Sequence, residues 1–124
     1  MALSRDNLLA SLRELQAERS GLLRRLTRDS ALAVGTVSVV RRKCGNPRCH
    51  CANGPGHPQT LFLFKGDDGR RHCKLVRRDD EERMQQAGER YRDFRQDLKR
   101  LRAIEQRAKE IIMALRDLRV LRYE

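Results

Sequence analysis

The feature that most constrains this chain is a short segment, residues 41–57, which reads RRKCGNPRCHCANGPGH. Three cysteines, Cys44, Cys49 and Cys51, fall within a stretch of eight residues, and His57 follows them. Gly, Pro and Asn fill the gaps, and these residue types favour tight turns. Such a loop has little apolar surface to bury, so we expect a bound metal ion to hold it in shape.

Zinc in closed structural sites takes four thiolate or imidazole ligands in tetrahedral geometry. The cysteines supply three, and the glycines and prolines that follow let the chain loop back to supply a histidine. The ligands we favour for one Zn2+ are Cys44, Cys49, Cys51 and His57. Cys73 is the rival fourth ligand, because its strand can return beside the loop. His50 and His72 are weaker candidates.

The alternatives are free thiols in a small core and a disulfide framework. The spacing of Cys49 and Cys51 disfavours a bond between those two residues. No apolar run approaches the roughly 18–20 residues that cross a bilayer, and the N-terminus lacks the order of a signal peptide. We therefore expect a cytoplasmic protein with reduced thiols, where clustered cysteines more often bind metal.

The segments on either side of this loop predict helices. Charged residues make up 36% of the 124 residues and aromatic residues 4%, so a large globular core is excluded. Leucines recur at helical spacing from Leu8 to Leu26, and a second apolar seam runs from Met84 to Leu118. The predicted class is α+β: two long helices, antiparallel and coiled-coil-like, flank a small zinc-stapled, three-stranded antiparallel sheet.

The predicted organisation has three parts. Residues 1–34 form an amphipathic helix, residues 35–78 a zinc-knuckle β insert, and residues 79–124 a long C-terminal helix. Within the insert, β-branched and aromatic residues predict strands at 36–42, 60–65 and 70–76. The sequence GDDG at 66–69 predicts a hairpin turn.

Local signals set the expected helix ends. Ser4 or Asp6 can cap the first helix, which should fade around residues 29–33, and Gly21 in its interior costs about 1 kcal/mol relative to Ala. Asp79 is the expected cap of the last helix. The last helix is predicted to be longer than the first by roughly 24 Å. An apolar seam extending that far needs a partner, so we expect a homodimer or another bound protein.

The excess positive charge is concentrated in the centre of the chain. Of the net charge of +11, residues 41–78 contribute +8, from ten basic and two acidic side chains. A compact patch of one sign attracts a polyanion, and nucleic acid is the usual one. The predicted nucleic-acid-binding residues are Arg41, Arg42, Lys43, Arg48, Arg70, Arg71, Lys74, Arg77 and Arg78. We considered Phe62 and Phe64 as base-stacking residues but expect them to lie in the core.

The motif CGNPRCHCANGPGHP, with the aromatic strand, hairpin, basic strand and long helix that follow it, resembles an uncharacterised family of small bacterial proteins. The resemblance covers about residues 36–100. It places Cys44, Cys49, Cys51 and His57 on the signature positions and leaves Cys73 off them. Members of that family are found near genes of mobile elements and recombination, and the family lends no established activity.

These observations favour a zinc-binding accessory protein that binds nucleic acid, DNA rather than RNA, and is linked to transposition or recombination. We expect a homodimer through the helices, a recombinase or other protein as a further partner, and no membrane. The alternative is a coiled-coil adaptor or regulator without direct nucleic-acid contact. We predict no enzymatic activity, because four ligands close the metal site and leave no open position for a substrate.

Overall fold

The first helix, α1, spans Arg5–Leu26 in the computed structural model, which describes residues 4–124. Residues 1–3 of the predicted first segment lie outside the described residues. The side chain of Ser4 caps the helix by accepting a 3.1 Å hydrogen bond from the Asn7 N–H, so Ser4 rather than Asp6 is the cap. The helix ends at Leu26, a few residues before the predicted fade, and the Thr27 hydroxyl donates to the Leu23 carbonyl there.

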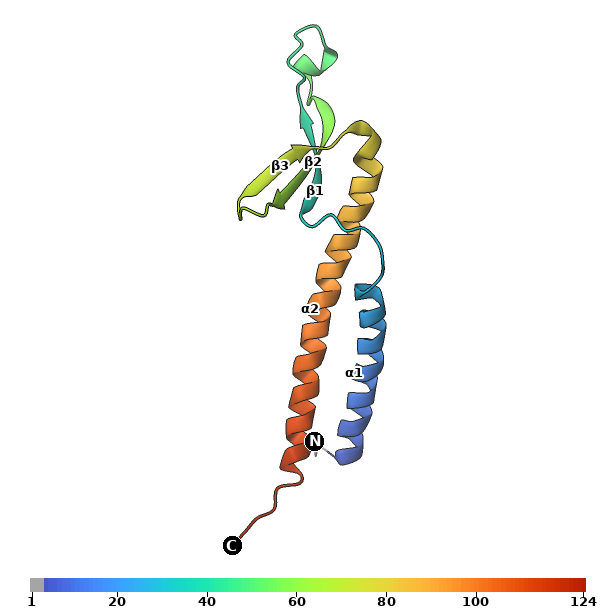
Figure 1. Ribbon diagram of the computed structural model, residues 1–124, viewed down its shortest axis with the longest axis vertical. Helices are drawn as coiled ribbons and strands as arrows, with labels where there is room; N and C mark the ends of the chain where they lie inside the picture. The colour runs from blue at the N-terminus through green and yellow to red at the C-terminus, as the bar shows by residue number, and fades with distance from the viewer. Residues whose placement is uncertain (1–3) are drawn as a thin grey trace. The chain divides into compact units, whose positions relative to one another are not determined.

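The central sheet has the predicted three antiparallel strands, and their order is β1-β2-β3 (Figure 1). They are β1 (Thr36–Arg42), β2 (His57–Lys65) and β3 (Arg71–Leu75). β1 matches the predicted strand, whereas β2 begins three residues earlier than predicted. The reason is that Arg42 at the end of β1 pairs with His57. The ladder thus continues down to residues 43–56, the candidate metal-binding loop.

The hairpin between β2 and β3 turns at residues 66–69. The Gly66 N–H donates to the Arg70 carbonyl over 2.9 Å, and the Gly69 N–H donates to the Gly66 carbonyl over 2.9 Å. Gly69 has φ +78°, a conformation that residues with a Cβ rarely adopt. The hairpin turn predicted at residues 66–69 is therefore present in the structure.

The last helix, α2, spans Glu81–Asp117 and follows a short 3-10 turn at Arg78–Asp80. Asp79 lies in that turn, so the predicted cap does not begin the helix. The predicted continuation to residue 124 is also wrong, because the helix stops at Asp117. Beyond that point Leu121 is 88% exposed. A helical turn whose apolar residues have nothing to pack against gains little stability.

The chain divides into two compact units. Among the described residues, the first contains 4–29 and 94–124, in which α1 lies beside the C-terminal part of α2 (Figure 1). Arg25 bonds Asp97 over 3.1 Å, and Glu18 bonds Arg100, further along α2. The residue earlier in α1 is bonded to the residue later in α2, so the two helices are antiparallel. The buried side chains between them are Leu8, Leu22, Ile104 and Ile111.

The second unit contains residues 30–93, that is, the sheet and the beginning of α2. Gly88 of α2 lies so close to β1 that a Cβ there would come within 2.9 Å of a Val37 methyl carbon. The Ala33 N–H donates to the Ala87 carbonyl over 3.1 Å, and both residues are buried. The first part of α2 therefore packs within this unit. Part of the length by which α2 exceeds α1 therefore finds its packing partner in this unit, without a second protein.

The helix glycines Gly21 and Gly88 predict opposite effects of the same substitution. A Cβ at Gly21 meets nothing within 4 Å, so Gly21→Ala should raise the free energy of unfolding by about 1 kcal/mol through helix propensity alone. Gly88→Ala should lower it, because displacing the stiff Val37 side chain costs about 1–3 kcal/mol, which outweighs the same propensity gain of about 1 kcal/mol. Urea unfolding of both variants measures the difference. A stabilised Gly88→Ala variant would show that the helix does not pack closely on β1.

Candidate metal centre

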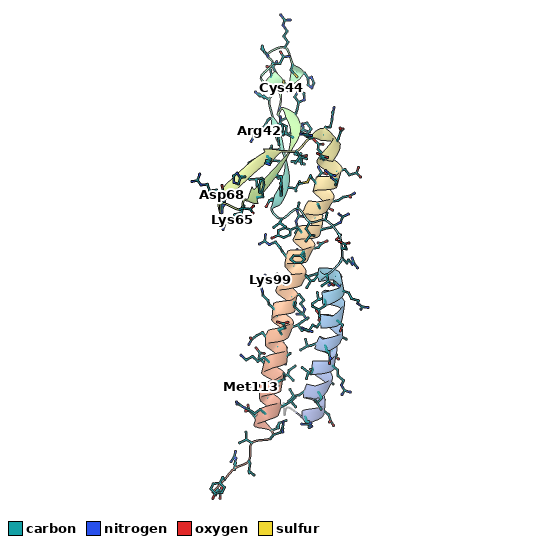
Figure 2. The ribbon with its side chains drawn as sticks, in the orientation of Figure 1. Arg42, Cys44, Lys65, Asp68, Lys99 and Met113 are labelled. Carbon is teal, nitrogen blue, oxygen red and sulfur yellow. The ribbon has the colours of Figure 1, made fainter. Side chains whose placement is uncertain are left out.

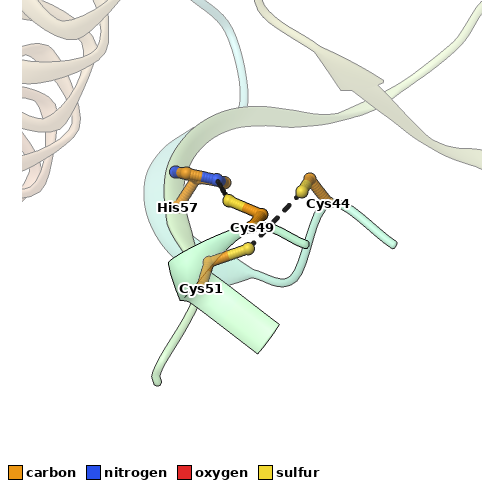
Figure 3. A group of neighbouring side chains, drawn as sticks. All are labelled: Cys44, Cys49, Cys51 and His57. Carbon is orange, nitrogen blue, oxygen red and sulfur yellow. Dashed lines mark hydrogen bonds between the residues drawn. The ribbon is translucent and has the colours of Figure 1, made fainter. Parts of the chain in front are cut away.

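The four favoured ligands come together at one end of the sheet (Figure 3). Cys44 follows β1, Cys49 precedes the 3-10 turn at His50–Asn53, Cys51 lies within that turn, and His57 is the first residue of β2. Their ligand atoms all lie within 4.8 Å of one another. The Cys51 side chain is buried, those of Cys49 and His57 are half-buried, and that of Cys44 is exposed. The grouping points to a small site near the surface.

The loop that carries the cysteines is shaped by its own polar and glycine residues. The Asn46 side chain accepts a 3.0 Å hydrogen bond from the Arg48 N–H, and the Asn46 carbonyl accepts one from the Cys49 N–H. Gly45 has φ +84°, which lets the chain reverse directly after Cys44. These local bonds return Cys49 toward Cys44 without any contribution from an apolar core.

The two limbs of the loop meet at Gly56, which is buried and has φ +94°. A Cβ at Gly56 would lie 2.4 Å from the carbonyl carbon of Arg42 and 2.7 Å from the Lys43 nitrogen. No side chain fits between these backbones. The Arg41 guanidinium also donates a 3.1 Å hydrogen bond to the Gly56 carbonyl. This contact places the residue before His57 directly against the residues before Cys44.

The distances suit a tetrahedral ion. The Sγ atoms of Cys44 and Cys51 are 3.4 Å apart, and the Cys49 Sγ lies 3.1 Å from the His57 Nε2. Zinc with bonds of about 2.3 Å to sulfur would hold two sulfur atoms about 3.8 Å apart. All four cysteines are free thiols, and 3.4 Å is far longer than a disulfide bond of about 2.05 Å. The group is thus compact enough for one ion after small side-chain adjustments.

The loop shifts the pKa values of two thiols in opposite directions. A backbone hydrogen bond from Asn46, helped by one from the Cys51 side chain, lowers the pKa of Cys44 to about 7. For Cys51, a backbone hydrogen bond from Cys44 lowers the pKa, but burial and the neighbouring Cys44 and Cys49 thiols outweigh it, so the pKa is raised. Metal binds thiolates, so an incoming ion would displace the protons that remain on these sulfurs.

The other candidate ligands lie elsewhere in the described chain. Cys73 sits in β3 opposite Leu63, is exposed, and is outside the four-residue group. His72 is bonded to Asp68 across the hairpin turn. His50 lies nearer, with its ring 5.6 Å from that of His57, but it is also outside the group. The structure therefore brings together the favoured set with His57, and zinc as its ion stays a prediction.

All nine predicted nucleic-acid-binding residues have exposed side chains. The strand register divides those on the sheet between its two faces. Lys74 lies opposite Phe62, whereas Arg71 lies opposite Lys65, which points to the other face. Arg41 is partly engaged in bracing the metal loop. Figure 2 shows Arg42 near Cys44, with Lys65 and Asp68 toward the hairpin turn.

Sequence reasoning missed one arrangement. His72 was weighed only as a weak ligand, and Phe64 was considered for base stacking but expected in the core. The two side chains are instead directly opposite each other in the hairpin, with ring centroids 5.4 Å apart. The sequence held part of the signal for this pairing, because a hairpin that turns at 66–69 places Lys65 opposite either Arg70 or Arg71. Choosing between those two registers needed the turn geometry itself.

Comparison with known proteins identifies a family. A model described as a domain of unknown function, DUF6788, matches residues 12–86, which is more than half of the chain. The chain belongs to this family. The match confirms the predicted membership of an uncharacterised family, while a bacterial source and proximity to mobile elements stay predictions. No curated protein and no solved structure matches the chain. Within the described residues 4–124, no helix is long and apolar enough to cross a membrane.

The close approach of the Gly56 backbone to Arg42 and Lys43 predicts that metal binding can be weakened without removing a ligand. Gly56→Ala should weaken zinc binding by at least tenfold, because the new Cβ separates the limbs that carry Cys44 and His57. Gly54→Ala is the matched control, since its Cβ would meet its nearest neighbour at 3.8 Å and its φ is −131°. Competition with a chromogenic zinc chelator measures both affinities. Equal affinities for the two variants would contradict the role of this contact.

Proposed function

We propose that the protein is a zinc-binding accessory protein that binds nucleic acid, DNA rather than RNA. The observation that carries the proposal is the four-residue group of Cys44, Cys49, Cys51 and His57 inside the most basic part of the chain. Three thiolates and a neutral imidazole around Zn2+ carry a net charge of −1. The segment 41–78 therefore keeps a net charge of +7 from its +8 when the ion is bound.

The role of zinc in this proposal is structural. The ion would hold Cys44 and His57 together and so fix the ends of β1 and β2. Lys43 and Arg48 lie on the loop itself and are exposed, so their positions depend on that fold. Such side chains contact phosphates and set the position of the protein on the strand, without specifying a base sequence. The closed set of four ligands fits this structural role, and we propose no catalytic step.

A place beside a recombinase or in transposition rests on the resemblance to proteins found near mobile elements. The charge distribution supports it in one respect, since an accessory protein of recombination has to meet DNA. The neighbouring genes and co-purification with a recombinase from cells that carry both would test this part independently of the metal site.

Removal of single charges should show whether the DNA contacts lie on the loop of residues 43–56 or elsewhere on the surface. Each of Lys43→Gln and Arg48→Gln should weaken binding to every DNA sequence alike and reduce the slope of log affinity against log salt by about 1. Lys99→Gln removes the same charge from α2, outside the basic segment, and should leave the slope unchanged. Fluorescence anisotropy with a labelled duplex over a range of salt concentrations gives these slopes.

Loss of the metal should act on the same binding. Cys49→Ser, or treatment with a chelator, should release zinc and lower DNA affinity at low salt. A flat salt response in the wild-type protein would contradict the electrostatic mechanism. Full DNA affinity in a variant shown to carry no zinc would contradict the link between the ion and the basic surface.

A second function, protein interaction through the helices, is favoured by a groove in the first unit. Leu12, Leu15, Ala108 and Ile112 line an open groove of about 450 Å3 beside the α1–α2 pair. Ile112 is 53% exposed there. We propose that a second copy of the chain covers this groove as a homodimer. The end segments carry net charges of only +2 and +1, in residues 1–40 and 79–124, so two copies would repel each other weakly.

The dimer is tested by a pair of matched substitutions. Ile112→Glu should convert the dimer to a monomer, because it puts a carboxylate into the covered groove. Leu121→Glu makes the same chemical change at a residue that is 88% exposed and outside the groove, and should leave the dimer intact. Sedimentation velocity gives the mass of each. A wild-type monomer at micromolar concentration would refute the proposal.

A further inference from the structure

The hairpin formed by β2 and β3 carries a stack of three rings. The centroids of Phe62 and Phe64 are 4.9 Å apart with the ring planes at 18°, and those of Phe64 and His72 are 5.4 Å apart at 23°. Phe64 and His72 are directly opposite each other in the strand register. The rings are therefore close to parallel and share one face of the hairpin.

The last ring of the stack, His72, is fixed by the turn beside it. Its Nε2 lies 3.1 Å from the Asp68 carboxylate, which also accepts a 2.9 Å hydrogen bond from the Arg70 N–H. A Cβ on Gly66 would lie 2.7 Å from the same Nε2, so the ring sits directly over the glycine backbone. The imidazole is thus held in one orientation before any ligand arrives, which lowers the entropic cost of binding.

Phe64 and His72 also line a surface pocket of about 620 Å3. Gly35 and Gly69 form part of its wall and add no side-chain bulk. The His72 side chain keeps 42% of its surface exposed. The pocket therefore offers room for a flat ring beside the exposed part of His72.

The surroundings of the pocket are cationic. Lys74 shares the sheet face of Phe64 and His72, and its ammonium lies 5.7 Å from the centroid of the Phe64 ring. Lys65 and Arg71 line the pocket from the opposite face of the hairpin. Asp67 and Asp68 are the only acidic residues in the segment 41–78, and Asp68 is already engaged by His72 and the Arg70 N–H. The pocket thus combines a platform for a flat ring with positive charge for an attached anion. A nucleotide has both parts.

We propose that this pocket binds an unpaired nucleobase by stacking, so that the preferred substrate class is single-stranded nucleic acid. This inference rests on the proposed function and deepens it. Bases in a duplex are stacked on one another and do not offer a free face, whereas every base of a single strand has one. Stacking is tolerant of base identity, in keeping with a surface that otherwise contacts phosphates.

The test separates bases from phosphates. Two fluorescein-labelled strands of about twelve nucleotides are compared by anisotropy, one of oligothymidylate and one of abasic tetrahydrofuran residues. Both carry the same phosphates. The zinc-loaded wild-type protein should bind oligothymidylate about tenfold more tightly than the abasic strand, because only oligothymidylate can stack.

Three variants assign the effect to the pocket. His72→Ala should lower the affinity for oligothymidylate to that for the abasic strand and leave abasic binding unchanged. His72→Phe keeps a ring and should keep the preference. Arg71→Gln should weaken both strands by the same factor, since it removes only charge. Phe64 is not substituted because it also lines a second pocket, together with Met84 and Ala87 of α2.

Each result decides between the two proposals. Equal affinities of the wild type for both strands overturn the stacking site and leave phosphate binding intact. Binding to neither strand at low salt overturns both proposals. If His72→Ala does not fold, by circular dichroism and zinc content, a 2-aminopurine placed in the strand replaces it. Stacking on a ring of the wild-type protein should change its fluorescence, and no change overturns the inference.

Discussion

The contact on which the candidate metal-binding loop depends lies between two backbones. The Gly56 backbone lies against the backbone of Arg42 and Lys43, where β1 ends and β2 begins. Only a residue without a side chain, at φ +94°, permits that approach. The approach brings the Cys44 and His57 side chains within ligand distance across two limbs of the chain. A ligand set scattered over fourteen residues thus becomes one site through a backbone fit and not through packing of side chains.

Few side chains in this chain are fully buried, and this explains why such a fit is needed. In the second unit they are mostly small, Ala33, Ala87 and Thr60, with Leu61 as the one large buried hydrophobic residue among those described. Burial at about 25 cal/mol per Å2 of apolar surface gives a loop like residues 43–56 very little stability. A structural zinc ion contributes its binding free energy to folding directly. With a metal ion bound, the thiols and the imidazole would supply the stability that leucines and phenylalanines supply in a larger domain.

Much of this structure could be predicted from residue patterns. β-branched runs and the GDDG turn placed the strands, and the Ser4 cap placed the start of α1. What the patterns missed depended on contacts distant in sequence. β2 begins at His57 because Arg42 pairs with it, and the pairing of Phe64 with His72 follows from a register that the turn alone sets. The Arg25–Asp97 and Glu18–Arg100 pairs likewise needed the antiparallel helix alignment.

The candidate metal ligands were the easier half of the site to predict, because four residues that can bind one ion lie within fourteen positions. The basic residues were harder. Their number and exposure follow from composition, but the division of Arg71 and Lys74 between opposite sheet faces follows only from the strand register. The net charge does not say on which face of the sheet the basic side chains lie. It predicts that a polyanion is attracted, and it leaves open which face the polyanion meets.

β2 connects the two proposed binding features and also keeps them apart. His57 begins the strand and Phe64 lies seven residues later, about 23 Å away along an extended chain, with side chains on opposite faces. Between them, β2 pairs with β1 from His57 to Leu63 and with β3 from Leu61 to Lys65. That second set of pairs holds the aromatic stack without help from the metal loop. Loss of zinc should therefore loosen the loop and its phosphate contacts while the ring platform persists, so the two contributions to binding are separable within one strand.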